Sequence, residues 1–260
     1  MEIRLNGMRA LVTGANSGIG RAIAIGLAQS GARVAVNYVA APEKADAVVA
    51  EIRAAGGDAI AVQADVSDAA QVAAMFARLD EAWGGIDVLV NNAGIDGGAS
   101  VSWEADPAKW RRVIDINLAG AFLCAREALR RMVAQKSGVV LGISSVHELI
   151  AWTGFSAYTA SKAGGAMMMK SMAQEAAPFG VRVLALGPGA IKTPINENVW
   201  SDPKMYADLI AKIPLGRMGT PEEIAAMAVF LVSDAAAYVT GTTVFVDGGM
   251  LDYPDFSHGG

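Results

Sequence analysis

The sequence contains a single cysteine, Cys124, which excludes an intramolecular disulfide and any cysteine-cluster metal site, so no metal is expected. Basic residues are also scarce: 21 Lys and Arg stand against 26 Asp and Glu, and the net charge is −5. This balance gives no positive footprint for nucleic acid. No window holds about 18 consecutive apolar residues, which argues against a membrane span, and the first residues lack a signal-peptide run. We therefore expect a soluble, cytoplasmic protein without nucleic-acid or membrane partners.

Apolar runs alternate with helical patterns along all 260 residues, and no linker or low-complexity tract divides them. The expected strands cover 10–14, 33–38, 59–66, 86–94, 138–145, 181–189 and 242–249. The expected helices cover 21–31, 44–57, 69–84, 107–135, 158–180 and 221–233. Continuous apolar strands are typical of a parallel sheet that is covered by helices on both faces. The pattern predicts one doubly wound α/β domain over 1–260, with a mostly parallel sheet of seven strands.

The least regular stretch of the chain is 190–220. A long connection in a compact domain is often a binding loop, so we expect it to border the substrate. A further tail, 250–260, follows the last expected strand.

A glycine-rich motif, "TGANSGIG", follows the first strand and opens the first helix. Its glycines, Gly14, Gly18 and Gly20, suit a tight turn and a helix N-terminus that faces a pyrophosphate. A tight turn without a ligand would need similar residues. "ADV" at 64–66 and "NNAG" at 91–94 end two further strands at the same edge of the sheet, where ligands of open α/β sheets bind.

The motif "YTASK" places Tyr158 and Lys162 four residues apart, so on a helix they share one face. An ordinary tyrosine titrates at about 10, too high for a base at neutral pH. A cation about 4 Å away contributes roughly 4 kcal/mol at an effective dielectric near 20, equivalent to about three pKa units. An exposed Tyr/Lys pair without a role is the alternative interpretation. Upstream, "GISSV" contains Ser144 and Ser145, whose side chains should face opposite sides of a strand.

These motifs, with Asn117 of "DINLAG" and with "GPGAIKTP", occur in the order and spacing of the classical short-chain dehydrogenase/reductases, and the resemblance covers essentially the whole chain. The resemblance implies a Rossmann-type domain, a nicotinamide cofactor, hydride transfer and a homotetramer. It also implies four catalytic residues. Ser145 bonds the reacting oxygen, Tyr158 moves the proton, Lys162 supports the phenolate, and Asn117 holds a water of a proton relay.

The same resemblance implies a set of cofactor-binding positions along the carboxyl edge of the sheet. They are Gly14, Asn16, Ser17, Gly18, Ile19, Gly20, Asn37, Asp65, Val66, Asn92, Ala93, Gly94, Tyr158, Lys162, Pro188, Gly189, Ile191 and Thr193.

The choice between NAD and NADP depends on the end of the second strand. An acid there would accept from the ribose 2′-OH, and an arginine would pair with a 2′-phosphate. Asn37, Tyr38 and Val39 are neither. We expect NAD or NADP, with NAD favoured.

Several segments, among them "SSVHELIAW" and "GPGAIKTPIN", resemble the bacterial glucose 1-dehydrogenases of this family, which oxidise C1 of β-D-glucose. The resemblance implies that Asp96, His147 and Asn196 face the sugar, beside Ser145 and Tyr158. A reductase of a ketone or 3-oxoacyl substrate is the alternative enzyme. A non-catalytic dinucleotide-sensing protein is an alternative of another class.

Overall fold

Seven parallel strands form one sheet, as the sequence predicts, and the structure gives their order as β3-β2-β1-β4-β5-β6-β7. The computed structural model describes residues 3–252, so residues 253–260 of the predicted tail lie outside the described part. The strands are β1 (Arg9–Val12), β2 (Arg33–Tyr38), β3 (Asp58–Gln63), β4 (Val88–Asn91), β5 (Gly138–Ile143), β6 (Val181–Pro188) and β7 (Thr243–Val246).

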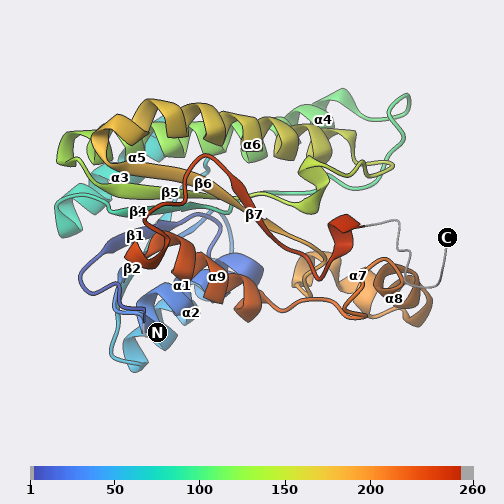
Figure 1. The fold of residues 1–260 in the computed structure, drawn as a ribbon, viewed down its shortest axis with the longest axis horizontal. Coiled ribbons are helices and arrows are strands. Elements are labelled where there is room, and N and C mark those ends of the chain that lie inside the picture. Colours follow the sequence, from blue (N-terminus) through green and yellow to red (C-terminus); the bar gives the residue numbers. More distant parts are fainter. Residues whose placement is uncertain (1–2, 253–260) are drawn as a thin grey trace.

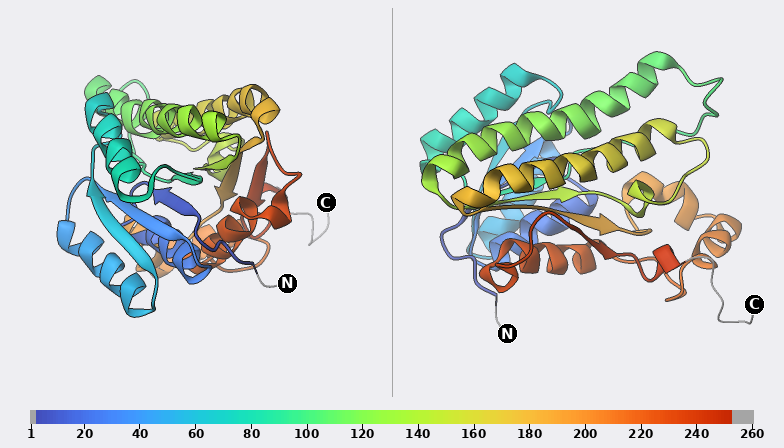
Figure 2. Two further views of the ribbon diagram at one scale, coloured as in Figure 1. Left: turned by 90° about the vertical axis from the view of Figure 1, so that its left-hand side faces the viewer. Right: turned by 45° about the horizontal axis from the view of Figure 1, so that its top comes forward.

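Helices cover both faces of the sheet, with α1, α2 and α9 on one side and α3, α5 and α6 on the other (Figures 1 and 2). The helices are α1 (Gly18–Gln29), α2 (Pro42–Ala54), α3 (Ala69–Trp83), α4 (Pro107–Ile114), α5 (Ala121–Gln135), α6 (Ser156–Ala176), α7 (Glu197–Trp200), α8 (Pro203–Ile210) and α9 (Pro221–Val232). The strand order reverses between β1 and β4, which makes a crevice at their carboxyl ends the natural ligand site of such a sheet.

Each central strand contributes side chains to two apolar layers, which explains its uninterrupted hydrophobic sequence. In β1, Val12 packs in the layer that contains Ile23 of α1, whereas Leu11 packs in the layer that contains Phe76 of α3. Burial on both faces is the expected consequence of parallel strands that carry helices on either side.

The predicted helix over 107–135 is interrupted. A π-helical segment, Asp115–Gly120, separates α4 from α5. Asn91 at the end of β4 donates to the carbonyl of Ala121 at 2.9 Å, and so satisfies a backbone acceptor beside the wide turn. π-Helical turns inside helices often coincide with functional sites, and this one carries Asn117.

The stretch 190–220 is more regular than the sequence interpretation allowed, because it contains α7 and α8. Asp202 caps α8 by accepting from the backbone N–H groups of Lys204 and Met205, and Pro203 occupies the first turn. An Asp–Pro pair is a helix-start signal that the irregular appearance of this segment concealed. Within residues 3–252, no helix has the length and apolar character needed to span a lipid bilayer.

Replacing Phe76 by Ala should lower the free energy of unfolding by about 3–5 kcal/mol, because the fully buried ring would leave a cavity. Phe179→Ala is the matched control, since that ring is 45% exposed and should change stability by about 0.5 kcal/mol or less. Urea denaturation of both variants measures the difference. Equal losses would show that the layer under α3 is not a packed core.

Candidate active site

The loops that follow β1, β4, β5 and β6 meet at the carboxyl edge of the sheet, because these four strands are neighbours. In Figure 1 the start of α6 lies on one side of this edge, and the segment that carries α7 and α8 lies on the other. Most of the predicted site residues lie on these loops.

The glycine loop after β1 is held against the end of β4. Gly14 and Gly18 adopt left-handed backbone conformations, with φ of 60° and 54°. A Cβ atom at Gly20 would run into the side-chain amide of Asn92 and the carbonyl of Gly14. That amide donates to the carbonyls of Thr13 (2.8 Å) and Gly14 (3.1 Å). The loop therefore tolerates no side chain at the point where its backbone turns into α1.

The N-terminus of α1 fits an anionic ligand. Ser17 is the N-cap residue, and its side chain makes no capping hydrogen bond, whereas Asp68 caps α3 by accepting from two backbone N–H groups. The first N–H groups of a helix need an acceptor, and a pyrophosphate can provide it. The neighbouring Asn16 donates to the carbonyl of Ala40 at 2.9 Å and ties the loop to the end of β2, while Ile19 packs partly buried on the core.

Asn37 does not present a free side chain to a cofactor, in contrast to the sequence interpretation. The Asn37 residue is only 1% exposed, and its side-chain oxygen accepts from Gly14 N at 3.1 Å. Its amide nitrogen donates to the carbonyls of Val62 (3.2 Å) and Ala64 (3.1 Å). Its geometry therefore joins the glycine loop to β2 and β3, and the residue that reaches solvent at the end of β2 is Val39.

Asp65 lies at the end of β3, with both carboxylate oxygens already bonded. One oxygen accepts from the backbone and hydroxyl of Ser67, and the other accepts from Arg112 at 2.7 Å. Burial opposes ionisation, but the bonds from Ser67 and Arg112 outweigh it and hold the pKa of Asp65 below its ordinary value. Val66 is buried against Gly120 of the π-helical segment. The carboxylate is therefore an anchor for α4 as well as a possible acceptor for an adenine amino group.

The loop after β6 closes on the glycine loop from the other side. A Cβ atom at Gly18 would lie 3.6 Å from the methyl group of Thr193. Pro188 ends β6. Gly189 lies so close to Asp247 that a Cβ atom added to the glycine would clash with the Asp247 backbone. Ile191 is buried and pairs with Gly219. These contacts place the predicted residues of the β6 loop along the same crevice.

Asn117 fixes the chain after "NNAG". Its side-chain oxygen accepts from Ile95 N at 2.9 Å, and its amide nitrogen donates to the Ile95 carbonyl (2.8 Å) and to Ser161 Oγ (3.2 Å). A Cβ atom at Gly94 would lie 3.2 Å from the same side-chain oxygen. Asn117 thereby links the β4 loop to α6, the helix that carries Tyr158.

Tyr158, Ser145 and Lys162 lie together at the start of α6. The Ser145 hydroxyl accepts from His147 N at 3.1 Å, and it lies near enough to the Tyr158 phenol to act against the rise of the phenol's pKa. The Lys162 ammonium donates to the Ile143 carbonyl at 2.8 Å and lies 5.4 Å from the centroid of the Tyr158 ring. The serine, the phenol and the ammonium thus converge on one point at the end of β5.

The expected lowering of the tyrosine pKa is wrong for the chain by itself. Burial raises the pKa of Tyr158 above its ordinary value, the Ser145 bond opposes the rise, and the charge of Asp96 adds to it. Burial also lowers the pKa of Lys162 to about 8, although the Glu148 charge opposes this change. Desolvation is the largest cause of both shifts, and the chain alone holds a neutral phenol that can donate a proton.

Glu148 is a charged neighbour of this group that the sequence interpretation left out. Its carboxylate accepts from Ser144 Oγ and from Thr243 Oγ1 (3.3 Å). The acid four residues after Ser144 in "SSVHE" was the available signal. Thr13 was also missed; its buried hydroxyl accepts from Asn92 N and from the next residue's N–H, at 2.9 and 3.0 Å.

The three residues expected to face a sugar differ in the hydrogen-bonding groups that they leave free for a substrate. The Asn196 side-chain oxygen accepts from Thr193 N, and one of its two amide N–H groups donates to the Ile191 carbonyl, which leaves one N–H for a ligand. The Nδ1 of His147 lies 3.0 Å from the Ile150 carbonyl, so it donates and leaves Nε2 as an acceptor. Asp96 accepts from Gly98 N at 3.1 Å in a turn beside the crevice.

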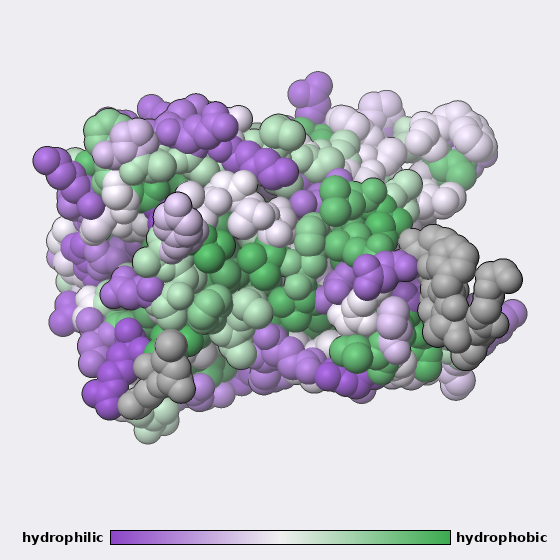
Figure 3. Space-filling model, in the orientation of Figure 1, coloured by the Kyte–Doolittle hydropathy of each residue, from purple (hydrophilic) through white to green (hydrophobic). Residues whose placement is uncertain are grey.

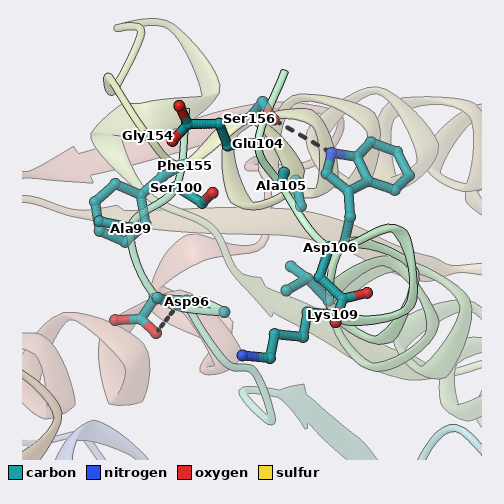
Figure 4. Close-up of a pocket in the computed structure, with 15 residues that line it drawn as sticks. Asp96, Ala99, Ser100, Glu104, Ala105, Asp106, Lys109, Gly154, Phe155 and Ser156 are labelled. Atoms are coloured by element: carbon teal, nitrogen blue, oxygen red, sulfur yellow. Dashed lines mark hydrogen bonds between the residues drawn. The ribbon is translucent and has the colours of Figure 1, made fainter. Parts of the chain in front are cut away.

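A pocket of about 320 Å³ lies next to Asp96, between the loop after β4 and the starts of α4 and α6 (Figure 4). Its wall includes Asp96, Lys109 and Phe155. Trp110 Nε1 donates to Ser156 Oγ at 3.2 Å, a bond that ties α4 to the start of α6.

Comparison with known proteins places this geometry in a family. Residues 14–251 match the family model described as enoyl-(acyl carrier protein) reductase. The 3beta-hydroxysteroid dehydrogenase 1 of Eggerthella lenta is 46% identical over 256 residues, which are 98% of this chain and 98% of the relative. The 3-oxoacyl-[acyl-carrier-protein] reductase of a Synechocystis species is 46% identical over 243 residues, which are 93% of this chain and 96% of the relative.

Solved structures agree with these relatives. A gluconate 5-dehydrogenase from Burkholderia cenocepacia, in complex with NADP and tartrate, superimposes with a TM-score of 0.92 at 35% identity and covers 96% of this chain and 98% of that one. The match extends over nearly the whole length in sequence and in structure. The chain belongs to the classical short-chain dehydrogenase/reductase family, whose members are NAD(P)-dependent oxidoreductases.

Proposed function

We propose that the chain interconverts an alcohol and a carbonyl compound at the carboxyl edge of the sheet, with Tyr158 as the group that moves the proton. The observation that carries this proposal is the position of the Lys162 ammonium, which donates to the Ile143 carbonyl at 2.8 Å and lies 5.4 Å from the centroid of the Tyr158 ring. A nicotinamide cofactor, when bound, supplies or accepts the hydride.

Each polar group of the site has a distinct task in this proposal. The Ser145 hydroxyl donates to a substrate carbonyl or accepts from a substrate alcohol. Tyr158 gives its proton to the carbonyl oxygen during reduction and takes it from the alcohol during oxidation. Lys162, fixed on the Ile143 carbonyl, supplies a positive charge that favours the phenolate. Asn117 holds a water that continues the proton path from Lys162.

We propose that the glycine loop and the uncapped N-terminus of α1 hold the cofactor pyrophosphate. NAD and NADP both fit, with NAD favoured, because Val39, 59% exposed at the end of β2, offers neither a carboxylate nor a cation. The NADP complex of the gluconate 5-dehydrogenase supports the inclusion of NADP.

For the substrate, we propose C1 of β-D-glucose or of a related aldose. His147 Nε2 and Asp96 support this, because they can pair with hydroxyl groups beside Tyr158. A ketone or 3-oxoacyl substrate is the second candidate, since one of the relatives is named a 3-oxoacyl reductase. The non-catalytic sensor is the weakest candidate, because Tyr158 and Lys162 are both present.

The charges on α5 favour a small substrate over one carried by an acidic protein. Arg126 and Arg130 approach Glu127, and Arg131 pairs with both Glu127 and Asp80. Two carboxylates therefore offset part of the positive charge of these three arginines.

A homotetramer completes the proposal. Figure 3 shows hydrophobic surface across the middle of the face that carries β7 and α9, and every residue of the edge strand β7 is only partly buried. On the opposite layer, Phe122 and Met167 are exposed on α5 and α6. Contiguous apolar surface of this kind commonly mediates association between subunits. Location in the cytoplasm stays a prediction from the sequence.

Gly20→Ala should weaken NADH binding by roughly tenfold or more, which corresponds to about 1.4 kcal/mol, because the new methyl group would displace Asn92 and the glycine loop. Gly165→Ala is the control, since a Cβ there meets nothing within 4 Å. Fluorescence titration with NADH measures both. Unchanged binding in Gly20→Ala would argue against the loop as the pyrophosphate site.

Tyr158→Phe should retain NADH affinity and lose nearly all turnover, typically a factor of 10² to 10⁴ for a missing acid–base group. Steady-state rates with a panel of sugars and ketones, measured with both cofactors, test this. Substantial activity in the variant would remove Tyr158 from its assigned role. If the wild-type protein binds NADH and turns over no substrate, the sensor becomes the better candidate.

The pH dependence should have opposite signs in the two directions. Because the pKa of Tyr158 is raised, the phenolate needed for oxidation accumulates only as the pH rises. The kcat/KM for alcohol oxidation should therefore increase towards alkaline pH, while that for reduction, which needs the protonated phenol, should fall. A flat profile in both directions would show that another group moves the proton.

A further inference from the structure

Three aromatic rings form a row in front of Tyr158. Trp152 stacks on His147, with centroids 4.5 Å apart and an interplanar angle of 12°, and on Phe155, at 3.8 Å and 22°. The rings of Trp152 and His147 both meet the Tyr158 ring edge to face, at 5.8 and 6.3 Å. Contacts of this geometry stabilise one arrangement of rings, so the row is a rigid wall that presents the ring edges.

This wall stands beside the reacting oxygen and remains accessible. Trp152 is 40% exposed although two rings stack on it. Its neighbour Leu149 is 68% exposed on the same connection between β5 and α6. At the far end of the row, Phe155 lines the pocket of about 320 Å³ next to Asp96. An exposed apolar surface next to a polar reaction centre indicates the contact face of a substrate.

We propose that Trp152 is a specificity-determining residue that packs against a saturated ring, and that the reacting hydroxyl or keto group is carried on a carbon of that ring. This inference rests on the proposed function, because it assumes that the reaction occurs at Tyr158. It narrows the substrate class to cyclic alcohols, hemiacetals and cyclic ketones.

A ring suits this wall better than an open chain for an entropic reason. A rigid ring loses little internal freedom when it packs against the exposed edge of the Trp152 indole, whereas an open chain must give up several rotamers to make the same contact. The pocket behind Phe155 then receives ring substituents, and Lys109 extends towards the Asp96 turn on its wall (Figure 4).

The test separates ring shape from polarity with two matched pairs of probes. β-D-Glucose and sorbitol are a cyclic and an open-chain polyol, and cyclohexanol and hexan-3-ol are their apolar counterparts. Oxidation of each is measured with NAD and NADP for the wild-type protein and for Trp152→Ala, Trp152→Phe and Trp103→Ala. Trp103 is the matched control, because it is 84% exposed on the loop before α4 and belongs to no part of the site.

The expected result is a preference for the cyclic member of at least one pair. Trp152→Ala should reduce that preference roughly tenfold, mainly through KM, because a lost aromatic contact of about 1.4 kcal/mol is tenfold in affinity. Trp152→Phe should keep most of the preference, Trp103→Ala should keep all of it, and NADH binding should be the same in every variant.

Different results would overturn the ring inference and the proposed function. Turnover of open-chain probes as good as that of cyclic ones, or an unchanged ratio in Trp152→Ala, would overturn the ring inference and leave the proposed function intact. Absence of turnover for all probes, together with normal NADH binding, would overturn the proposed function and the inference with it.

Discussion

The structure depends on how the backbone polar groups at the carboxyl ends of neighbouring parallel strands find hydrogen-bond partners. Where β1 and β4 stop, their backbone carbonyls and N–H groups lose their sheet partners in a region that excludes water. Thr13 and Asn92 provide these partners with four hydrogen bonds between 2.8 and 3.1 Å. An unpaired buried polar group costs about 1–3 kcal/mol. These four hydrogen bonds therefore hold the glycine loop in one conformation against the end of β4.

Asn37 and Asn117 also use side-chain hydrogen bonds to join loops to neighbouring elements. The first joins the glycine loop to β3, and the second joins the β4 loop to α6. The N–H donors of both amides are used within the chain, so these side chains fix the positions of the loops. The crevice is consequently lined by backbone and small side chains, which suits a nucleotide cofactor that must lie close to the sheet edge.

Burial has opposite consequences for the two titratable partners at the start of α6. It raises the pKa of the phenol and lowers that of the ammonium, so both groups are driven towards their neutral forms. The Ser145 bond and the Glu148 charge oppose these shifts. A site of this kind holds its proton until a charged cofactor or substrate changes the local field, which is consistent with chemistry that occurs only in the assembled complex.

The sequence by itself determined the seven-stranded parallel sheet, the glycine loop and the spacing of Tyr158 and Lys162, because each depends on local periodicity or on residues close together in the chain. The tertiary structure alone decided that Asn37 and Asn196 bond to the chain's own backbone, that burial raises the pKa of Tyr158, and that the Trp152 ring meets the Tyr158 ring edge to face. Hydrogen-bond saturation, desolvation and ring packing depend on neighbours that lie far away along the chain. The start of helix α8 could have been predicted from the sequence, because Asp202 and Pro203 are a helix-start signal. It was not predicted, because the residues around it show no regular pattern.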